Sequence, residues 1–228
     1  MLSKDTETFA VIISSTPSKR GFYNIQIADA VGEVYDLIVH EEIIVDYRLV
    51  VGKEIDEETF HNIQNITEYQ QAYSYAIGIL ARRMYTEKEI KRKLYGRKTP
   101  DDVIDAVVEK LKNIQLLNDL TYATLYIENQ VKNGKKSRRK IISDLMAKGV
   151  NSTIIDEVSD LFNGYSEVSL IQTEIEEAYR QYERQQLSDF DLARKITQKL
   201  ARKGFDIYEV QRQYGFFLED LEAEATEF

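Results

Sequence analysis

The chain has 228 residues, of which 43% are hydrophobic and 11% aromatic, and its formal net charge is −9. This composition is typical of a globular protein and excludes an intrinsically disordered one. Because the sequence contains no cysteine, it also excludes disulfides, thiolate metal sites and cysteine nucleophiles.

The start of the chain shows no targeting signal. MLSKDTETFAVII lacks the basic start, the long apolar run and the small-residue cleavage site of a signal peptide. No apolar stretch approaches the roughly 20 residues that a membrane helix needs. We therefore expect a cytoplasmic protein that does not bind membranes.

The first predicted elements are strands. Side chains alternate with period two in FYNIQIAD, and TFAVIISS and EVYDLIVH are similarly rich in β-forming residues. STPSKRG and DAVG supply the turns. We predict a small antiparallel β segment over about residues 8–40, then a helical or extended piece (EEIIVDYRLV) and a short helix from Asp56. Residues 1–71 would form this N-terminal extension.

From residue 72 the hydrophobic period becomes 3.6, and the pattern occurs three times. Leu145 lies 51 residues after Leu94, and Leu200 lies 55 residues after Leu145. The other aligned sets are Ile90, Ile141 and Ile196; Ala72, Ala123 and Ala178; Ile104, Ile155 and Val210; and Leu111, Phe162 and Phe217. Repeats of this length indicate stacked helical units. We predict a mainly α fold of three tandem three-helix repeats, residues 72–122, 123–165 and 166–228, that form an elongated rod.

Local signals mark the ends of these helices. TEKE, beginning at Thr86, is a capping box that opens the second helix of repeat 1, and Pro100 stands at the first position of its third helix. Gly149 and Gly204 stand where a helix end requires a left-handed residue. Repeat 1 has Lys98 at the equivalent position, which predicts a different turn there.

The sequence offers no catalytic or metal-binding arrangement. His40 and His61 have no ligand-like spacing, and NGKKS at 133–137 lacks the glycine that a phosphate-binding loop requires five residues earlier. The paired acids at 101–102 fit the first turn of a helix. We expect a protein that is not an enzyme and holds no cofactor or metal.

Charge follows helix position within the repeat. The second helices, predicted at 86–98, 135–148 and 189–203, carry 17 basic and five acidic side chains, whereas the third helices are net acidic. Phosphates would repel such third helices, which argues against a helix-turn-helix DNA reader. Basic residues of the second helices that point away from the apolar face are predicted to bind a partner, and Lys136, Arg139 and Lys140 among them are predicted to be unnecessary for folding. The predicted partner-binding residues are Lys88, Arg92, Lys136, Arg139, Lys140, Lys195, Lys199 and Arg202.

Four stretches of the repeats carry a family resemblance. They are TEKEIKRKL (86–94), LLNDLTYA (116–123), GKKSRRKIISDLMAKGV (134–150) and ARKITQKLARKGF (193–205). They resemble the RecX family, bacterial regulators of the RecA recombinase. The resemblance covers residues 72–220, and the N-terminal β segment is similar to the extension of longer members, common in Gram-positive bacteria.

The resemblance implies a non-enzymatic modulator, mainly an inhibitor, of RecA in recombination, DNA repair and the SOS response. Such a protein would bind the groove or the end of the RecA–DNA filament and limit filament extension, ATP hydrolysis, strand exchange and co-protease activity. We expect it to be a monomer.

Two other functions remain open. A direct single-stranded DNA binder should place stacking aromatics beside its basic residues. Tyr95, next to Arg92, is the only candidate in the predicted second helices. A plain helical scaffold is the third possibility.

Overall fold

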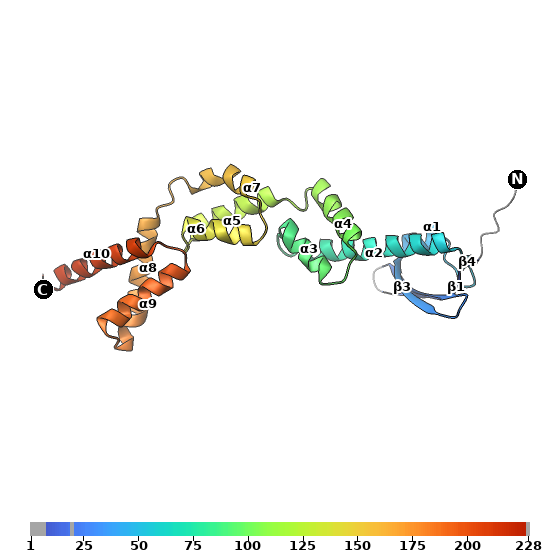
Figure 1. Ribbon diagram of the computed structural model, residues 1–228, viewed down its shortest axis with the longest axis horizontal. Coiled ribbons are helices and arrows are strands. Elements are labelled where there is room, and N and C mark those ends of the chain that lie inside the picture. Colours follow the sequence, from blue (N-terminus) through green and yellow to red (C-terminus); the bar gives the residue numbers. More distant parts are fainter. Residues whose placement is uncertain (1–7, 19–20, 227–228) are drawn as a thin grey trace. The chain divides into compact units, whose positions relative to one another are not determined.

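The computed structural model describes residues 8–18 and 21–226, which form two compact units (Figure 1). Unit 1 comprises the described residues up to 85 together with residues 90–117. Unit 2 comprises residues 86–89 and the described residues from 118 onward.

Unit 1 begins with an antiparallel sheet whose strand order is β3-β2-β1-β4. Its strands are β1 (Ala10–Pro17), β2 (Phe22–Asp29), β3 (Val34–His40) and β4 (Glu54–Ile55), and α1 (Glu41–Asp46) follows β3. The β segment predicted over residues 8–40 is therefore confirmed, and β4 adds a two-residue edge that the sequence pattern did not reveal. The predicted alternation also holds, because Ile25 and Ile27 are fully buried whereas Asn24 is exposed.

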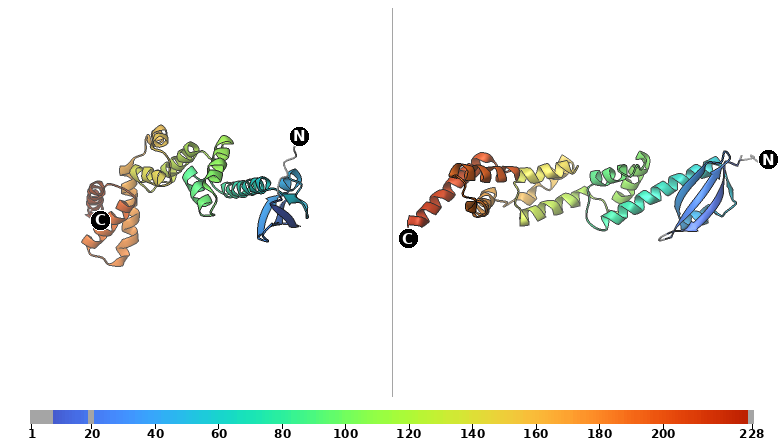
Figure 2. Two further views of the ribbon diagram at one scale, coloured as in Figure 1. Left: turned by 45° about the vertical axis from the view of Figure 1, so that its right-hand side comes forward. Right: turned by 90° about the horizontal axis from the view of Figure 1, so that it is seen from below.

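The helix that begins after Asp56 is long, not short as we expected. α2 (Glu57–Leu80) has 24 residues, and the Asp56 carboxylate accepts a hydrogen bond from the Thr59 N–H at 2.7 Å at its start. The expected boundary at 71/72 falls inside this helix (Figure 2). No glycine or proline interrupts residues 57–77, so nothing stops the helix where the packing changes. Its first half packs in the core of the sheet, and its second half packs in the core of repeat 1.

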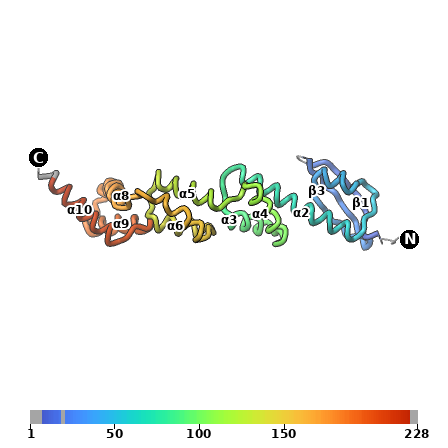
Figure 3. The backbone as a smooth tube through the Cα atoms, turned by 90° about the horizontal axis from the view of Figure 1, so that it is seen from above, coloured from blue at the N-terminus to red at the C-terminus, as the bar shows by residue number. Residues whose placement is uncertain are grey.

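Three sets of three helices are present, as the repeat pattern predicted (Figure 3). The first set is α2, α3 (Glu87–Tyr95) and α4 (Asp101–Asn113). The second set is α5 (Asp119–Asn133), α6 (Arg138–Ala147) and α7 (Ser152–Glu157), followed by the 3-10 helix η1 (Ser159–Phe162). The third set is α8 (Glu167–Tyr182), α9 (Asp189–Arg202) and α10 (Ile207–Thr226), with the 3-10 helix η2 (Glu183–Gln185) before α9.

The predicted repeat register is confirmed by burial. Leu94, Leu145 and Leu200 are fully buried, as are the isoleucines four residues before each. Each leucine belongs to a separate hydrophobic cluster, so each repeat has a core of its own. Within unit 2, for example, α8, α9 and α10 all contact one another.

The turn between the second and third helices is the same in all three repeats. Gly149 and Gly204 have φ of +93° and +88°, and Lys98 takes the same left-handed conformation with φ of +62°. In each repeat the residue after this position donates its N–H to the carbonyl of the aligned leucine. The donors are Thr99, Val150 and Phe205, and the distances are 3.3, 3.1 and 3.3 Å. The expectation of a different turn at Lys98 is therefore wrong. A lysine can adopt this conformation at a cost of about 1–2 kcal/mol.

The predicted helix starts are mostly confirmed. Thr86 and Glu89 exchange the two hydrogen bonds of a capping box, each 3.2 Å long. Asn151 caps α7 through the Thr153 N–H. Pro100 is one residue off our prediction, because it precedes α4 as its cap residue and the helix begins at Asp101.

Candidate partner-binding surface

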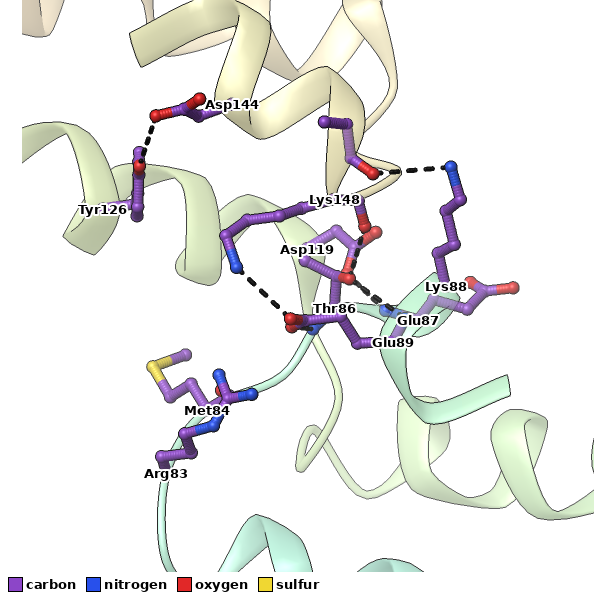
Figure 4. Close-up of polar contacts among 11 residues, drawn as sticks. Arg83, Met84, Thr86, Glu87, Lys88, Glu89, Asp119, Tyr126, Asp144 and Lys148 are labelled. Carbon is purple, nitrogen blue, oxygen red and sulfur yellow. Dashed lines mark hydrogen bonds and ion pairs between the residues drawn. The ribbon is translucent and has the colours of Figure 1, made fainter. Parts of the chain in front are cut away.

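Two of the predicted partner-binding lysines share one carboxylate. The Nζ atoms of Lys136 and Lys140 lie 2.7 and 2.8 Å from the two carboxylate oxygens of Asp144. The Tyr126 hydroxyl donates to the same carboxylate at 3.3 Å (Figure 4). The lysine side chains remain 35% and 38% exposed, whereas the Asp144 side chain is 19% exposed. The largely buried carboxylate of Asp144 thus fixes the positions of both lysine side chains.

The pKa values in this cluster follow from its contacts. Burial raises the pKa of Asp144, but hydrogen bonds and positive charge from Lys136 and Lys140 outweigh it and hold the pKa below its ordinary value. The pKa of Lys136 is raised, chiefly by its hydrogen bond to Asp144. These lysines therefore compensate a largely buried charge, and the expectation that they are unnecessary for folding stays a prediction. Their contact with a partner stays a prediction.

A second set of contacts lies at the start of α3, within unit 2. We call it the first joint, formed by residues 86–89 with residues 147–149 and Asp119. The Thr86 hydroxyl donates to the carbonyl of Lys148 at 2.6 Å, and the N–H of residue 87 donates to Asp119 at 2.9 Å (Figure 4). The first N–H groups of a helix lack partners within it, so these contacts complete the helix start.

Lys88, a predicted partner-binding residue, belongs to the first joint. Its Nζ donates to the carbonyl of Ala147 at 3.5 Å, and its side-chain stem covers Gly149. The ion pair between Glu89 and Lys148, at 3.2 Å, closes the joint (Figure 4). Glu89 is 8% exposed, so this pair is largely withdrawn from solvent.

The same arrangement recurs one repeat later in unit 2. This second joint is formed by residues 137–140 with residues 203–204 and Glu167. The N–H of Ser137 donates to the carbonyl of Lys203 at 3.0 Å, and the N–H of residue 138 donates to Glu167 at 2.7 Å. The Arg139 guanidinium donates to the carbonyl of Gly204 at 3.2 Å. Arg139 thus occupies the place that Lys88 has in the first joint.

Close packing explains the glycines of both joints. A Cβ atom on Gly149 would overlap the Cβ atom of Lys88, and one on Gly204 would lie 2.6 Å from Lys140 Cβ and 2.6 Å from Ser137 Oγ. The approaching helix therefore requires glycine at these two positions, and the positive φ favours it. The sequence identified these glycines as turn residues but gave no sign of the joints, because the partners lie about 60 residues apart.

The other predicted partner-binding residues are not paired with a carboxylate of the described chain, so their positive charge can interact with a partner. Apart from Lys136 and Lys140, the predicted residues have no carboxylate partner in the described part of the chain. They are Lys88, Arg92, Arg139, Lys195, Lys199 and Arg202.

The best defined of these cations lie on α9. Lys195 and Lys199 donate to glutamine side chains at 3.0 and 2.9 Å, and their Nζ atoms lie 5.8 and 5.6 Å from the ring centre of Tyr182. Arg202 is exposed and donates to a backbone carbonyl of its own helix. Amides and a ring orient Lys195 and Lys199, which form no ion pair within 4 Å among the described residues, although the charge of Lys199 also helps to lower the pKa of Glu177. The surface around Lys195, Lys199 and Arg202, which we call the α9 patch, is therefore suited to bind anionic groups.

Aromatic side chains lie near cations at more places than the sequence indicated. Tyr95 is 53% exposed, as a stacking residue should be. Phe190, in the first turn of α9, is 75% exposed and adds a second exposed ring in the second helices, and the stacking of either ring on bases stays a prediction. In unit 1 the Arg83 guanidinium lies 3.7 Å from the ring centre of Tyr85. The sequence signal for Phe190 was its place between two acids directly after a helix cap, where no core position is expected.

Among the described residues, no group of three or more acidic or histidine side chains could hold a metal ion. The same residues include no helix that is both long and apolar enough to cross a membrane. His40 caps α1, and its Nδ1 accepts a hydrogen bond from the N–H of Glu42 at 3.4 Å.

Known proteins share these repeats. Two family models match, RecX first three-helix domain at residues 72–111 and RecX second three-helix domain at residues 118–158. The regulatory protein RecX of Finegoldia magna is 33% identical over 164 residues, which cover 70% of this chain and 77% of that protein. The regulatory protein RecX of Levilactobacillus brevis is 30% identical over 198 residues, which cover 86% and 72%. A crystal structure of regulatory protein RecX matches with a TM-score of 0.58 and 27% identity, covering 89% of this chain and 98% of that one.

Proposed function

The chain belongs to the RecX family of regulatory proteins, and we propose that it modulates, mainly as an inhibitor, the RecA recombinase. It would bind the groove or the end of the RecA–DNA filament and limit filament extension, and with it ATP hydrolysis, strand exchange and co-protease activity. It would act without catalysing a reaction of its own, in the cytoplasm.

The observation that supports this proposal is the α9 patch. Its three cations have no carboxylate partner among the described residues, although the segment from residue 151 onward has eight basic and 17 acidic side chains. Such a local excess of positive charge favours contact with acidic protein surface or with DNA phosphates. A RecA–DNA filament offers both kinds of anionic group.

The first test is the ATPase activity of RecA on single-stranded DNA, titrated with this protein. We expect the rate to fall at substoichiometric amounts, because stopping the growth of one filament end prevents many RecA subunits from binding. The protein alone should hydrolyse no ATP. An unchanged rate of ATP hydrolysis and of strand exchange at a molar excess would contradict the proposal.

The second test concerns the α9 patch. Replacing Lys195, Lys199 and Arg202 together by alanine should weaken inhibition by about tenfold or more, which is roughly 1.4 kcal/mol of binding free energy. Exposed charges contribute little to stability, so the melting temperature should hardly change. In the matched control, alanine replaces Lys110, Lys132 and Arg184, which removes the same charge outside the second helices. Equal inhibition by the two triple variants would remove the α9 patch from the binding surface.

Direct binding of single-stranded DNA is the second candidate function. It is favoured by the cations that lie beside aromatic rings, Lys195 and Lys199 at Tyr182 and Arg83 at Tyr85. Bases stack on accessible rings while cations contact phosphates, and the rings of Tyr182 and Tyr85 are partly exposed. Anisotropy of a labelled single strand, measured without RecA, separates the two functions. Binding that weakens steeply with salt and is reduced by Tyr182→Ala supports this candidate. Binding to filaments alone supports the first.

A further inference from the structure

Each joint of unit 2 has two sides, the N-terminal end of a second helix and the turn that it covers. Repeat 1 has the same turn, at residues 97–99 in unit 1, with Lys98 in place of glycine. An open pocket of about 250 Å³ lies beside this turn, and residues 97–100 line it together with Glu68, Gln71 and Ala72. This acceptor pocket corresponds to the covered turns at Gly149 and Gly204.

The acceptor pocket keeps the groups that receive a helix end in the joints. Glu68 lies 51 residues before Asp119, the carboxylate of the first joint, and Arg97 lies 51 residues before Lys148, whose carbonyl accepts the Thr86 hydroxyl. In the part of the chain that the structure describes, no hydrogen bond ends on the Glu68 carboxylate or the Arg97 carbonyl. The acceptor pocket thus resembles the turns at Gly149 and Gly204, which the starts of α3 and α6 cover in the two joints.

The other unused side is the N-terminal end of α9. The cap residue of α9, Ser188, lies eight residues before the aligned Ile196. The cap residue of α3, Thr86, lies only four residues before Ile90, so α9 starts one turn earlier in the repeat. The Ser188 hydroxyl accepts a hydrogen bond from the Asp191 N–H at 3.2 Å, as the Thr86 hydroxyl does from Glu89, and it donates to the Asp191 carboxylate at 2.8 Å. We call this end, with Asp189, Phe190 and Asp191, the donor end.

The two unused sides are complementary in charge. The donor end carries the carboxylates of Asp189 and Asp191, of which Asp191 also pairs with Arg194 at 3.0 Å. The acceptor pocket presents the exposed cations of Arg97, which lies 4.5 Å from the ring centre of Tyr75, and of Lys98. The side chain of Lys98 excludes a lysine stem packed as Lys88 packs on Gly149. An exposed aromatic ring suits this position, because it can lie across the lysine stem and attract its ammonium group. Phe190 stands two residues after its cap, as Lys88 does.

We propose that the donor end of one copy of this protein docks in the acceptor pocket of a second copy. The two sides differ, so the interface is heterologous and can add copies one after another. This association revises the expectation of a monomer and does not depend on the proposed action on RecA. A single helix end in a small pocket makes a weak contact, well below the roughly 1,200 Å² of a stable interface.

Sedimentation velocity of the full chain, from micromolar to several hundred micromolar concentrations, tests the proposal. The wild type should show a weight-average sedimentation coefficient that rises with concentration and falls again with added salt. Lys98→Glu and Phe190→Ala should each weaken the association about tenfold or more. Tyr208→Ala and Lys110→Glu, matched changes at exposed positions outside both sides, should associate like the wild type. Circular dichroism establishes that each variant is folded.

Mixing the two variants gives the decisive result. Lys98→Glu retains a functional donor end and Phe190→Ala retains a functional acceptor pocket. At concentrations at which each variant alone is monomeric, an equimolar mixture should therefore form dimers and nothing larger. A sedimentation coefficient independent of concentration in the wild type overturns the proposal. Association that persists in both Lys98→Glu and Phe190→Ala also overturns the proposal, because it would indicate another surface, such as the edge of the sheet. A mixture that stays monomeric, or that grows beyond dimers, also overturns it.

Discussion

Replacing Gly149 by alanine should destabilise unit 2 through the first joint. The residue has φ of +93°, and the added Cβ atom would overlap the Cβ atom of Lys88. A Cβ atom is fixed by its backbone and cannot rotate away. The start of α3 must therefore move from the turn, or the turn must distort.

Two costs combine at this position. A left-handed alanine costs about 1–2 kcal/mol, and forcing extra volume into a packed contact costs about 1–3 kcal/mol. Alanine also restricts the unfolded chain, which returns about 0.4–1 kcal/mol. We expect a net loss of roughly 2–4 kcal/mol in the free energy of unfolding.

Urea unfolding followed by circular dichroism measures this loss, and Gly164→Ala is the matched control. Gly164 also lies in unit 2 and has φ of +80°, but nothing lies within 4 Å of the position that its added Cβ atom would take. The control should therefore lose only the cost of the left-handed backbone, less the same effect on the unfolded chain, which is a net loss of about 0–1.6 kcal/mol. The difference between the two variants isolates the contact with Lys88. Equal losses would refute the close packing of the first joint.

Three further predictions concern the core of repeat 2, the lysine cluster around Asp144 and the ion pair of the first joint. Leu145→Ala, at a fully buried position, should cost about 2–5 kcal/mol in urea unfolding. The lowered pKa of Asp144 contributes stability that is present at neutral pH and lost below about pH 4, and thermal melts of Asp144→Asn should show a flatter acid-side fall. A double-mutant cycle of Glu89→Gln and Lys148→Met should give a coupling of about 1 kcal/mol or more, because the pair is largely buried. An additive cycle would mean that the pair does not stabilise the joint.

The repeats could be predicted because their signals are local. The register of Leu94, Leu145 and Leu200 follows from helical periodicity, and the capping box at Thr86 lies within four residues. The length of α2 was missed for a related reason. Its sequence contains no local stop signal, and the change from one core to another along the helix is set by distant residues.

The candidate site was harder to predict, because its contacts are long-range. Helical position placed Lys136 and Lys140 on the polar face of a helix predicted from residue 135, but α6 begins at Arg138, so Lys136 precedes it. The pattern also could not reveal that both lysines reach Asp144. The joints bring together residues such as Thr86 and Lys148, 62 positions apart. No period or motif in a single sequence reports such a pair, and only the three-dimensional packing of the helices creates it.

Lys98 shows how a departure from a repeat pattern can be explained physically. Its φ of +62° means that the turn itself accepts a residue other than glycine. What requires glycine at 149 and 204 is the helix start that covers those turns, since a Cβ atom would overlap or crowd the lysine stems there. Within unit 1 the turn at Lys98 is exposed, and a lysine stands where its charge can face solvent. The glycine therefore marks a turn that receives another helix of the same chain, and its absence marks the open end of the array.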